Sequence, residues 1–135
     1  METPWKPRGS GRARGPAGVT PRRVLFICSR NQWRSPTAEK IFSEWQGLEV
    51  MSAGLDPSAV EPVTPEHLGW ADVIFVMERK HRTKLSRKFR SDLKNQKIVV
   101  LGIPDKYRYM DSALVELLER LVSPHLGRAG RNEVR

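Results

Sequence analysis

The chain has 135 residues, a length that suits one domain with a single modest hydrophobic core. Its formal charge of +9 favours an anionic partner, such as nucleic acid, an acidic membrane surface or a phosphorylated substrate, without choosing among them. The chain has one cysteine, which excludes an intramolecular disulfide and a metal site built from several thiolates. Cys28 is therefore either a buried apolar side chain or a reactive group.

Composition divides the chain into a basic start and a folded part. The first 23 residues carry six Lys or Arg side chains against one Glu and are rich in Gly and Pro, so they cannot bury enough apolar surface to fold. We expect a disordered basic tail over residues 1–22, a folded domain over 23–126 and a flexible C-terminal tail over 127–135. Because no segment resembles a membrane span or a signal peptide, we expect a cytoplasmic location and no membrane partner.

The first half of the folded part begins with a strand, a loop and a helix. Residues 24–28 are a continuous apolar run, as in a central parallel strand. Ser35 and Pro36 are typical of a helix start, with Ser35 as the N-cap, and apolar residues then recur at helical spacing as far as Trp45. Residues 48–52 are a predicted second strand.

The second half repeats the alternation of strands and helices. Thr64 begins a short predicted helix that ends near Trp70, and residues 73–77 and 98–101 are predicted strands. Between these strands lies a highly charged segment with a narrow apolar helical face at His81, Leu85 and Phe89. Asp111 caps the last predicted helix. This order predicts an α/β fold of three αβα layers with a four-stranded parallel sheet, which binds ligands beyond the carboxyl ends of its strands.

The segment between the first strand and the first helix carries the chemistry. It begins at Cys28, and Arg34 follows after five residues. A tight loop that enters a helix turns backbone N–H groups towards a bound phosphate, and the helix dipole strengthens the field. The same field favours the thiolate of Cys28, while the planar fork of Arg34 suits bidentate contact with two phosphoryl oxygens. We therefore predict a phosphate-binding loop with a cysteine nucleophile after the first strand.

This loop, with Asn31 in its middle and Ser35 and Pro36 after Arg34, closely resembles the signature of the low-molecular-weight protein tyrosine phosphatases. The resemblance covers most of residues 23–122. It extends to four further segments: Ala38-Glu39, Ser52-Ala53-Gly54, Met77-Glu78 and Ile103-Pro104-Asp105. The resemblance implies that residues 23–126 are a phosphatase domain without a metal or other cofactor. Its expected reaction is the hydrolysis of phosphate monoesters, above all protein phosphotyrosine, through a phosphocysteine intermediate.

The resemblance also implies the roles of individual residues. Cys28 is the expected nucleophile, Arg34 holds the phosphoryl oxygens, and Asp105 acts first as general acid and then as general base. The expected phosphate-binding residues are Ser29, Arg30, Asn31, Gln32, Trp33, Arg34 and Ser35. Ser35 would donate a hydrogen bond to the sulfur, and Asn31 would hold the loop in shape. The expected aromatic walls of the substrate cleft are Trp33, Tyr107 and Tyr109.

Several residues depart from the family pattern. Arg30 replaces a usual glycine, Trp33 replaces a frequent second cysteine, and Lys106 follows Asp105 where proline is usual. Asp111 lies close enough in sequence to be a rival general acid. The three histidines do not share a metal-ligand spacing, so we expect structural or surface roles for them.

Two other classes of function remain as alternatives. Arsenate reduction uses the same kind of loop and would here need an external thiol, because the chain has no second cysteine. A binding module without turnover would recognise phosphate esters or nucleic acid. The complete set of Cys28, Arg34 and Asp105 argues against a module without turnover, and the absence of a recognisable nucleic-acid motif argues against nucleic acid. The expected partner is a phosphorylated protein or a small aryl phosphate.

Overall fold

The structure is a computed structural model that describes residues 22–126. The expected basic tail over residues 1–22 lies outside this range except for Arg22, which is the first residue of strand β1. The expected flexible tail over residues 127–135 also lies outside the described residues.

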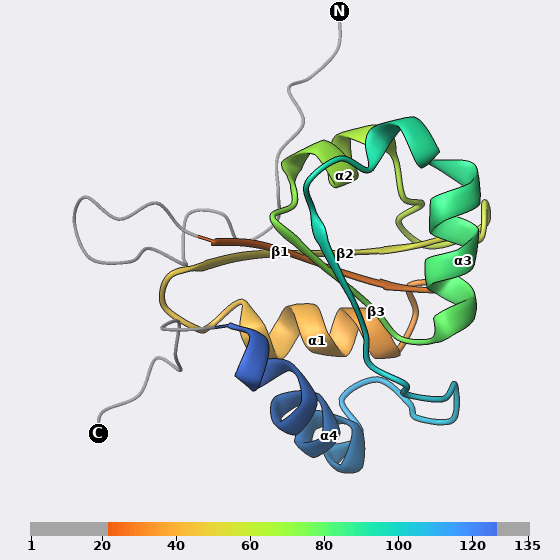
Figure 1. The fold of residues 1–135 in the computed structure, drawn as a ribbon. Coiled ribbons are helices and arrows are strands. Elements are labelled where there is room, and N and C mark those ends of the chain that lie inside the picture. Colours follow the sequence, from red (N-terminus) through yellow and green to blue (C-terminus); the bar gives the residue numbers. More distant parts are fainter. Residues whose placement is uncertain (1–21, 127–135) are drawn as a thin grey trace, which may run out of the picture.

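A four-stranded parallel sheet runs through the centre of the molecule (Figure 1). Its strands are β1 (Arg22–Cys28), β2 (Leu48–Gly54), β3 (Val73–Val76) and β4 (Lys97–Val100). They lie in the order β2-β1-β3-β4, and all three neighbouring pairs are parallel. Because β1 lies between β2 and β3 and both its faces are covered, it is apolar from Val24 to Cys28.

Helices cover both faces of the sheet. On one face lie α1 (Arg34–Phe42) and α4 (Ser112–Val122), and on the other α2 (Pro65–Trp70) and α3 (Arg79–Lys88) (Figure 1). Side chains of β1 alternate between the two layers, so that Phe26 packs in the core under α1 and α4, and Leu25 in the core under α2 and α3. The predicted α/β fold with three layers and four parallel strands is confirmed.

The helix starts agree with the sequence prediction at two of three positions. The Thr64 side chain accepts a hydrogen bond from the N–H of His67 and caps α2, and Asp111 caps α4 through the N–H of Ala113. Helix α1 instead begins at Arg34, and Ser35 is its second residue. The prediction of Ser35 as an N-cap is wrong, because its hydroxyl contacts side chains of the preceding loop.

Three loops meet at the carboxyl edge of the sheet. Residues 29–33 follow β1, Met77 and Glu78 follow β3, and residues 101–111 follow β4. In a parallel sheet this edge is where ligands bind, since the loops there enclose a crevice. Within residues 22–126, none of the helices is long and apolar enough to cross a membrane.

Candidate active site

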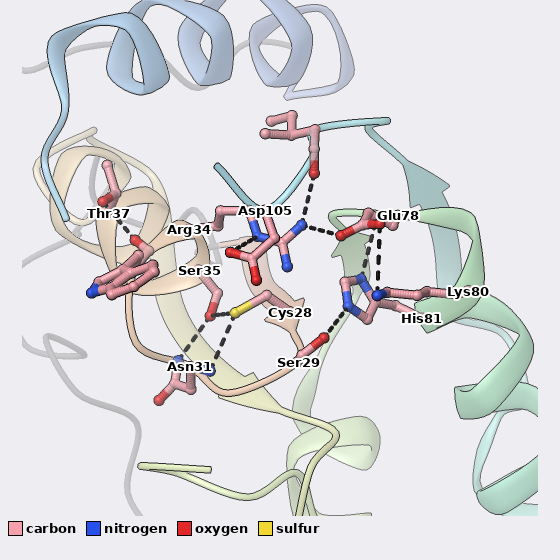
Figure 2. Close-up of polar contacts among 12 residues, drawn as sticks. Cys28, Ser29, Asn31, Arg34, Ser35, Thr37, Glu78, Lys80, His81 and Asp105 are labelled. Carbon is pink, nitrogen blue, oxygen red and sulfur yellow. Dashed lines mark hydrogen bonds and ion pairs between the residues drawn. The ribbon is translucent and has the colours of Figure 1, made fainter. Parts of the chain in front are cut away.

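The sulfur of Cys28 lies at the bottom of the loop, where it is almost fully buried. The backbone N–H of Asn31 donates to Sγ at 3.2 Å, and the hydroxyl of Ser35 lies 3.0 Å from Sγ (Figure 2). Ser35 Oγ already accepts from the Asn31 side-chain amide at 2.9 Å, so its own hydrogen is directed to the sulfur or to the more distant carbonyl of Ala53 at 3.5 Å. The sulfur thus accepts from the Asn31 N–H on one side and lies within hydrogen-bond distance of the Ser35 hydroxyl on another.

The backbone of the loop is turned so that its carbonyls point outward. The consecutive carbonyls of Cys28, Ser29 and Arg30 accept hydrogen bonds of 2.9–3.1 Å from the N–H groups of Leu55, Asp56 and Val60. Because these carbonyls face the segment after β2, the N–H groups of the same peptide units point away from that segment. Consecutive N–H groups oriented alike are the backbone geometry that anion-binding nests use.

Gly54 is the position at which this loop and the end of β2 approach most closely. A Cβ atom at Gly54 would lie 2.6 Å from the carbonyl oxygen of Ser29 and 2.6 Å from the Cβ of Ala59. Neither distance is physically tolerable, so only glycine fits without displacement of the loop. The glycine of the Ser52-Ala53-Gly54 segment noted in the sequence is thus required for steric reasons.

Asn31 is the residue around which the loop turns. Its φ of +57° lies in the left-handed region, which asparagine tolerates better than most residues. Its side-chain amide donates to Ser35 Oγ and to Ser52 Oγ, both at 2.9 Å, and Ser52 in turn donates to the carboxylate of Glu39 at 2.5 Å. The loop is therefore tied both to helix α1 and to strand β2.

Arg34 is buried, and its guanidinium is fixed from one side. Nη1 donates to the carboxylate of Glu78 and, at 2.7 Å, to the carbonyl of Ile103 (Figure 2). Because these two acceptors use the hydrogens of Nη1, the edge formed by Nε and Nη2 is the one available for bidentate contact with a phosphoryl group. Nε also lies 3.6 Å from Oδ1 of Asp105.

The structure brings Asp105, rather than Asp111, to the guanidinium of Arg34. The Asp105 side chain is 57% exposed on the segment after β4, so it is accessible to a substrate. Asp111 instead accepts a 2.9 Å hydrogen bond from the Ala113 N–H at the start of α4. The segment that carries Asp105 is anchored to α1, because the N–H of Met110 donates to Oγ1 of Thr37 at 2.9 Å.

The remaining predicted residues lie on the rim of the loop. Arg30 and Gln32 are exposed, and Arg30 lies 3.8 Å from the carboxylate of Asp56, outside the nest. Arg30 has no positive φ, so its backbone does not require the glycine usual at this position. Trp33 is 36% exposed with the guanidinium of Arg108 over its ring at 5.3 Å.

The two predicted tyrosines differ in their environment. Tyr107 is partly buried against the core under α1 and α4, and the ammonium of Lys106 lies 5.6 Å from its ring centroid. Tyr109 is half exposed. The aromatic rings of Trp33 and Tyr107 thus each lie next to a cation, Arg108 and Lys106 respectively.

Comparison with solved structures decides the fold family. The structure matches the YwlE arginine phosphatase from Geobacillus stearothermophilus with a TM-score of 0.60 and 23% identity, covering 78% of this chain and 93% of that chain. It matches the tyrosine phosphatase Wzb from Escherichia coli K30 in complex with phosphate with a TM-score of 0.61 and 23% identity, covering 77% and 95%. A low molecular weight protein tyrosine phosphatase from Streptococcus pyogenes matches with a TM-score of 0.63 and 16% identity, covering 79% and 95%.

The chain has the fold of the low-molecular-weight protein tyrosine phosphatases. The resemblance inferred from the loop and the four further segments is confirmed at the level of the fold. No protein-family model and no curated protein sequence matches the chain.

Within this fold, Glu78 and His81 form a side-chain network that the sequence analysis did not assign to the site. The Nδ1 of His81 accepts from the N–H of Glu78 at 3.0 Å, so the ring proton lies on Nε2. Nε2 is 2.9 Å from the hydroxyl of Ser29 and therefore donates to it (Figure 2). The Ser29 hydroxyl hydrogen then remains available as a donor. The only signal in the sequence was the three-residue spacing of Glu78 and His81 at the start of a helix.

Electrostatics keep this network in one protonation state. Burial, followed by the positive charge of Arg34, lowers the pKa of His81 from 6.5 to about 4. For Glu78, desolvation raises the pKa, but the hydrogen bond and charge of Arg34 together outweigh it and lower the pKa. At neutral pH the network therefore holds a neutral imidazole and a charged carboxylate. Among the described residues, no group of three or more His, Cys, Asp or Glu side chains is placed to hold a metal ion.

Proposed function

We propose that the protein is a phosphatase that hydrolyses phosphate monoesters, with protein phosphotyrosine as the expected substrate and a phosphocysteine on Cys28 as the intermediate. The observation that carries this proposal is the placement of one buried sulfur between two hydrogen-bonding groups, in a loop whose first three carbonyls bond to the segment after β2. Beside that sulfur lies Arg34, with its Nη1 donors already occupied. These features suit a thiolate and a phosphoryl dianion held side by side.

In the first half of the reaction, the Cys28 thiolate attacks phosphorus in line and the bond from phosphorus to the leaving oxygen breaks. The Nε–Nη2 edge of Arg34 and the amides of the loop hold the equatorial oxygens as charge is redistributed among them. Asp105 donates its proton to the departing phenolate. The alcohol product leaves, and a thiophosphate ester remains on Cys28.

In the second half, the Asp105 carboxylate removes a proton from a water molecule, and that water attacks phosphorus. The sulfur–phosphorus bond breaks and inorganic phosphate leaves, which restores the thiolate. Ser35 stabilises the thiolate as a leaving group, since its hydroxyl lies 3.0 Å from Sγ. Protons balance over the cycle, because Asp105 regains from water the proton that it gave to the phenolate.

The test is the hydrolysis of aryl phosphates with leaving groups of different basicity. Cys28→Ser is expected to abolish turnover. Asp105→Asn should lower kcat by about 10²–10⁴-fold for basic leaving groups and much less for acidic ones, as expected for loss of a general acid. Asp111→Asn is the matched control and should retain kcat. Full activity of Cys28→Ser would refute the mechanism, and a loss confined to Asp111→Asn would show that the acid is misassigned.

Phosphoarginine is a second candidate substrate, because one of the similar structures is described as an arginine phosphatase. Lys106 and Arg108 lie next to Tyr107 and Trp33, the side chains proposed to line the cleft, so a guanidinium-bearing substrate would meet like charges there and the aryl ester is favoured. Parallel assays with phosphotyrosine and phosphoarginine peptides decide between them. Arsenate turnover that depends on an external thiol, without aryl phosphate hydrolysis, would instead support the reductase alternative. We also propose that the protein is located in the cytoplasm.

A further inference from the structure

Helix α3 carries an unusual density of positive charge. Six of its ten residues are Lys or Arg, and none is acidic. Helix α3 lies on the face of the sheet opposite α1 and α4 (Figure 1), and its buried residues are His81 and Leu85. All six basic side chains are exposed.

This charge pattern works against the stability of the helix. Arg79, Lys80 and Arg82 lie in the first turn, at the positive end of the helix dipole, where anions are the stabilising residues. Lys80 and Lys84, and Lys84 and Lys88, are like charges four residues apart, which repel each other on a helix surface. The cations at the start of α3 therefore do not stabilise the helix, whereas Arg87 and Lys88 lie in its last turn, where cations are favourable.

One side of α3 forms an open groove of about 700 Å³. We call it the α3 groove, and it is lined by Arg79, Arg82, Thr83, Ser86, Arg87 and Arg90. Within residues 22–126, none of the four arginines has a carboxylate within ion-pair distance, unlike Lys80 and Arg30, which lie near Glu78 and Asp56. Their charge is therefore not neutralised by the fold.

The spacing of these side chains fits a regularly charged strand. The four arginines follow one another at intervals of three, five and three residues, which corresponds to steps of about 4.5 to 7.5 Å along the axis of α3 and its continuation. Guanidinium and hydroxyl groups are the side chains that contact nucleic-acid phosphates without reading base sequence. Among the residues that the structure describes, no apolar or aromatic side chain lines the groove to anchor a peptide, although such anchors carry most of the binding energy in protein–protein contacts.

We propose that the α3 groove binds the phosphodiester backbone of nucleic acid. The groove begins at Arg79, directly after Glu78, which pairs with Arg34 of the catalytic loop. A bound strand therefore passes beside the site at one end of α3 and extends about 15 Å along the helix. Binding does not need the nucleophile, so this proposal stands apart from the proposed hydrolysis.

The test is a salt series of fluorescence anisotropy titrations with labelled single-stranded RNA, single-stranded DNA and duplex DNA, using the full chain. Arg82→Gln with Arg87→Gln removes two charges from the groove. The matched control is Lys40→Gln with Arg120→Gln, which removes two exposed charges from α1 and α4 on the opposite face. The groove variant should reduce the slope of log K against log salt by about 2, and the control variant should not change it.

Competition by acidic polypeptides tests whether the groove prefers nucleic acid to other polyanions. Poly-glutamate of equal total charge should compete weakly, because carboxylates on a flexible chain do not match the phosphate contacts. Equal loss of affinity in the groove and control variants, or equal binding of poly-glutamate or an acidic phosphopeptide, would overturn the proposal.

Hydrolysis of a small aryl phosphate separates this proposal from the proposed function. The groove variant should hydrolyse the aryl phosphate as the wild type does, and Cys28→Ser should retain nucleic-acid affinity. If nucleic-acid affinity instead depended on Cys28, the strand would occupy the catalytic loop and the groove assignment would fail. Differences among the RNA, DNA and duplex arms identify which nucleic acid supplies the backbone.

Discussion

The pH dependence of stability tests the buried state of His81 directly. The pKa of His81 is about 4 in the folded protein, against an ordinary value of 6.5. Between these two pH values the unfolded chain binds a proton on this histidine and the folded protein does not. Stability is unaffected above pH 6.5 and falls as the pH drops from 6.5 towards 4. The shift of roughly 2.5 pKa units limits the total loss to about 3 kcal/mol, of which about 2 kcal/mol develops between pH 7 and pH 5.

His81→Asn removes this titration and keeps a side-chain acceptor near the N–H of Glu78. Urea unfolding of wild type and variant at pH 7 and pH 5 should give a wild-type loss about 2 kcal/mol larger than that of the variant. Ser29→Ala is the control: it removes the partner of Nε2 but leaves the ring buried, so the full pH dependence should remain. If the free energy of unfolding changed with pH equally in wild type and His81→Asn, the reasoning would be refuted, because His81 would then have the same pKa in the folded and the unfolded state.

Two further substitutions test how the loops are held. Gly54→Ala places a Cβ against the Ser29 carbonyl and should lower kcat for aryl phosphates and cost about 1–3 kcal/mol in urea unfolding. Gly69→Ala, where a Cβ meets no atom, should be neutral or stabilising, and equal behaviour of the two would contradict the steric argument. Thr37→Val removes the acceptor of the Met110 N–H, so kcat should fall most for basic leaving groups. A loss independent of the leaving group would mean that Thr37 does not hold the acid-bearing segment.

The position of the Cys28 loop between a strand and a helix could be predicted from the sequence because its signals are local. Residues 24–28 are apolar without interruption, and the Cys28–Arg34 spacing lies directly between this run and a helical pattern. Loop-to-helix geometry follows from a few consecutive residues, so a single sequence is sufficient to identify it. The same local reasoning failed at Ser35, since a serine before proline matches an N-cap pattern whether or not tertiary partners compete for its hydroxyl.

Contacts between distant residues could not be predicted in the same way. Arg34 and Glu78 are 44 positions apart, and Ser29 and His81 are 52 apart. Both contacts exist because β3 lies next to β1, and alternating strands and helices do not by themselves specify which strand is the neighbour of β1. The sequence pattern placed His81 on the apolar face of a helix and so indicated that it is buried. The orientation of its ring, however, depends on the contact with Ser29 in the loop after β1.

The strand order also explains how the loop is held on two sides by different kinds of contact. On the β2 side, backbone N–H groups of residues 55–60 hold the loop carbonyls, so this side sets the shape of the anion nest. On the β3 side, the Glu78 carboxylate and the His81 imidazole hold the side chains of Arg34 and Ser29. A change on the β2 side is therefore expected to displace the Cys28 sulfur and the loop amides together, whereas a change on the β3 side should reorient the Arg34 guanidinium with little effect on the sulfur.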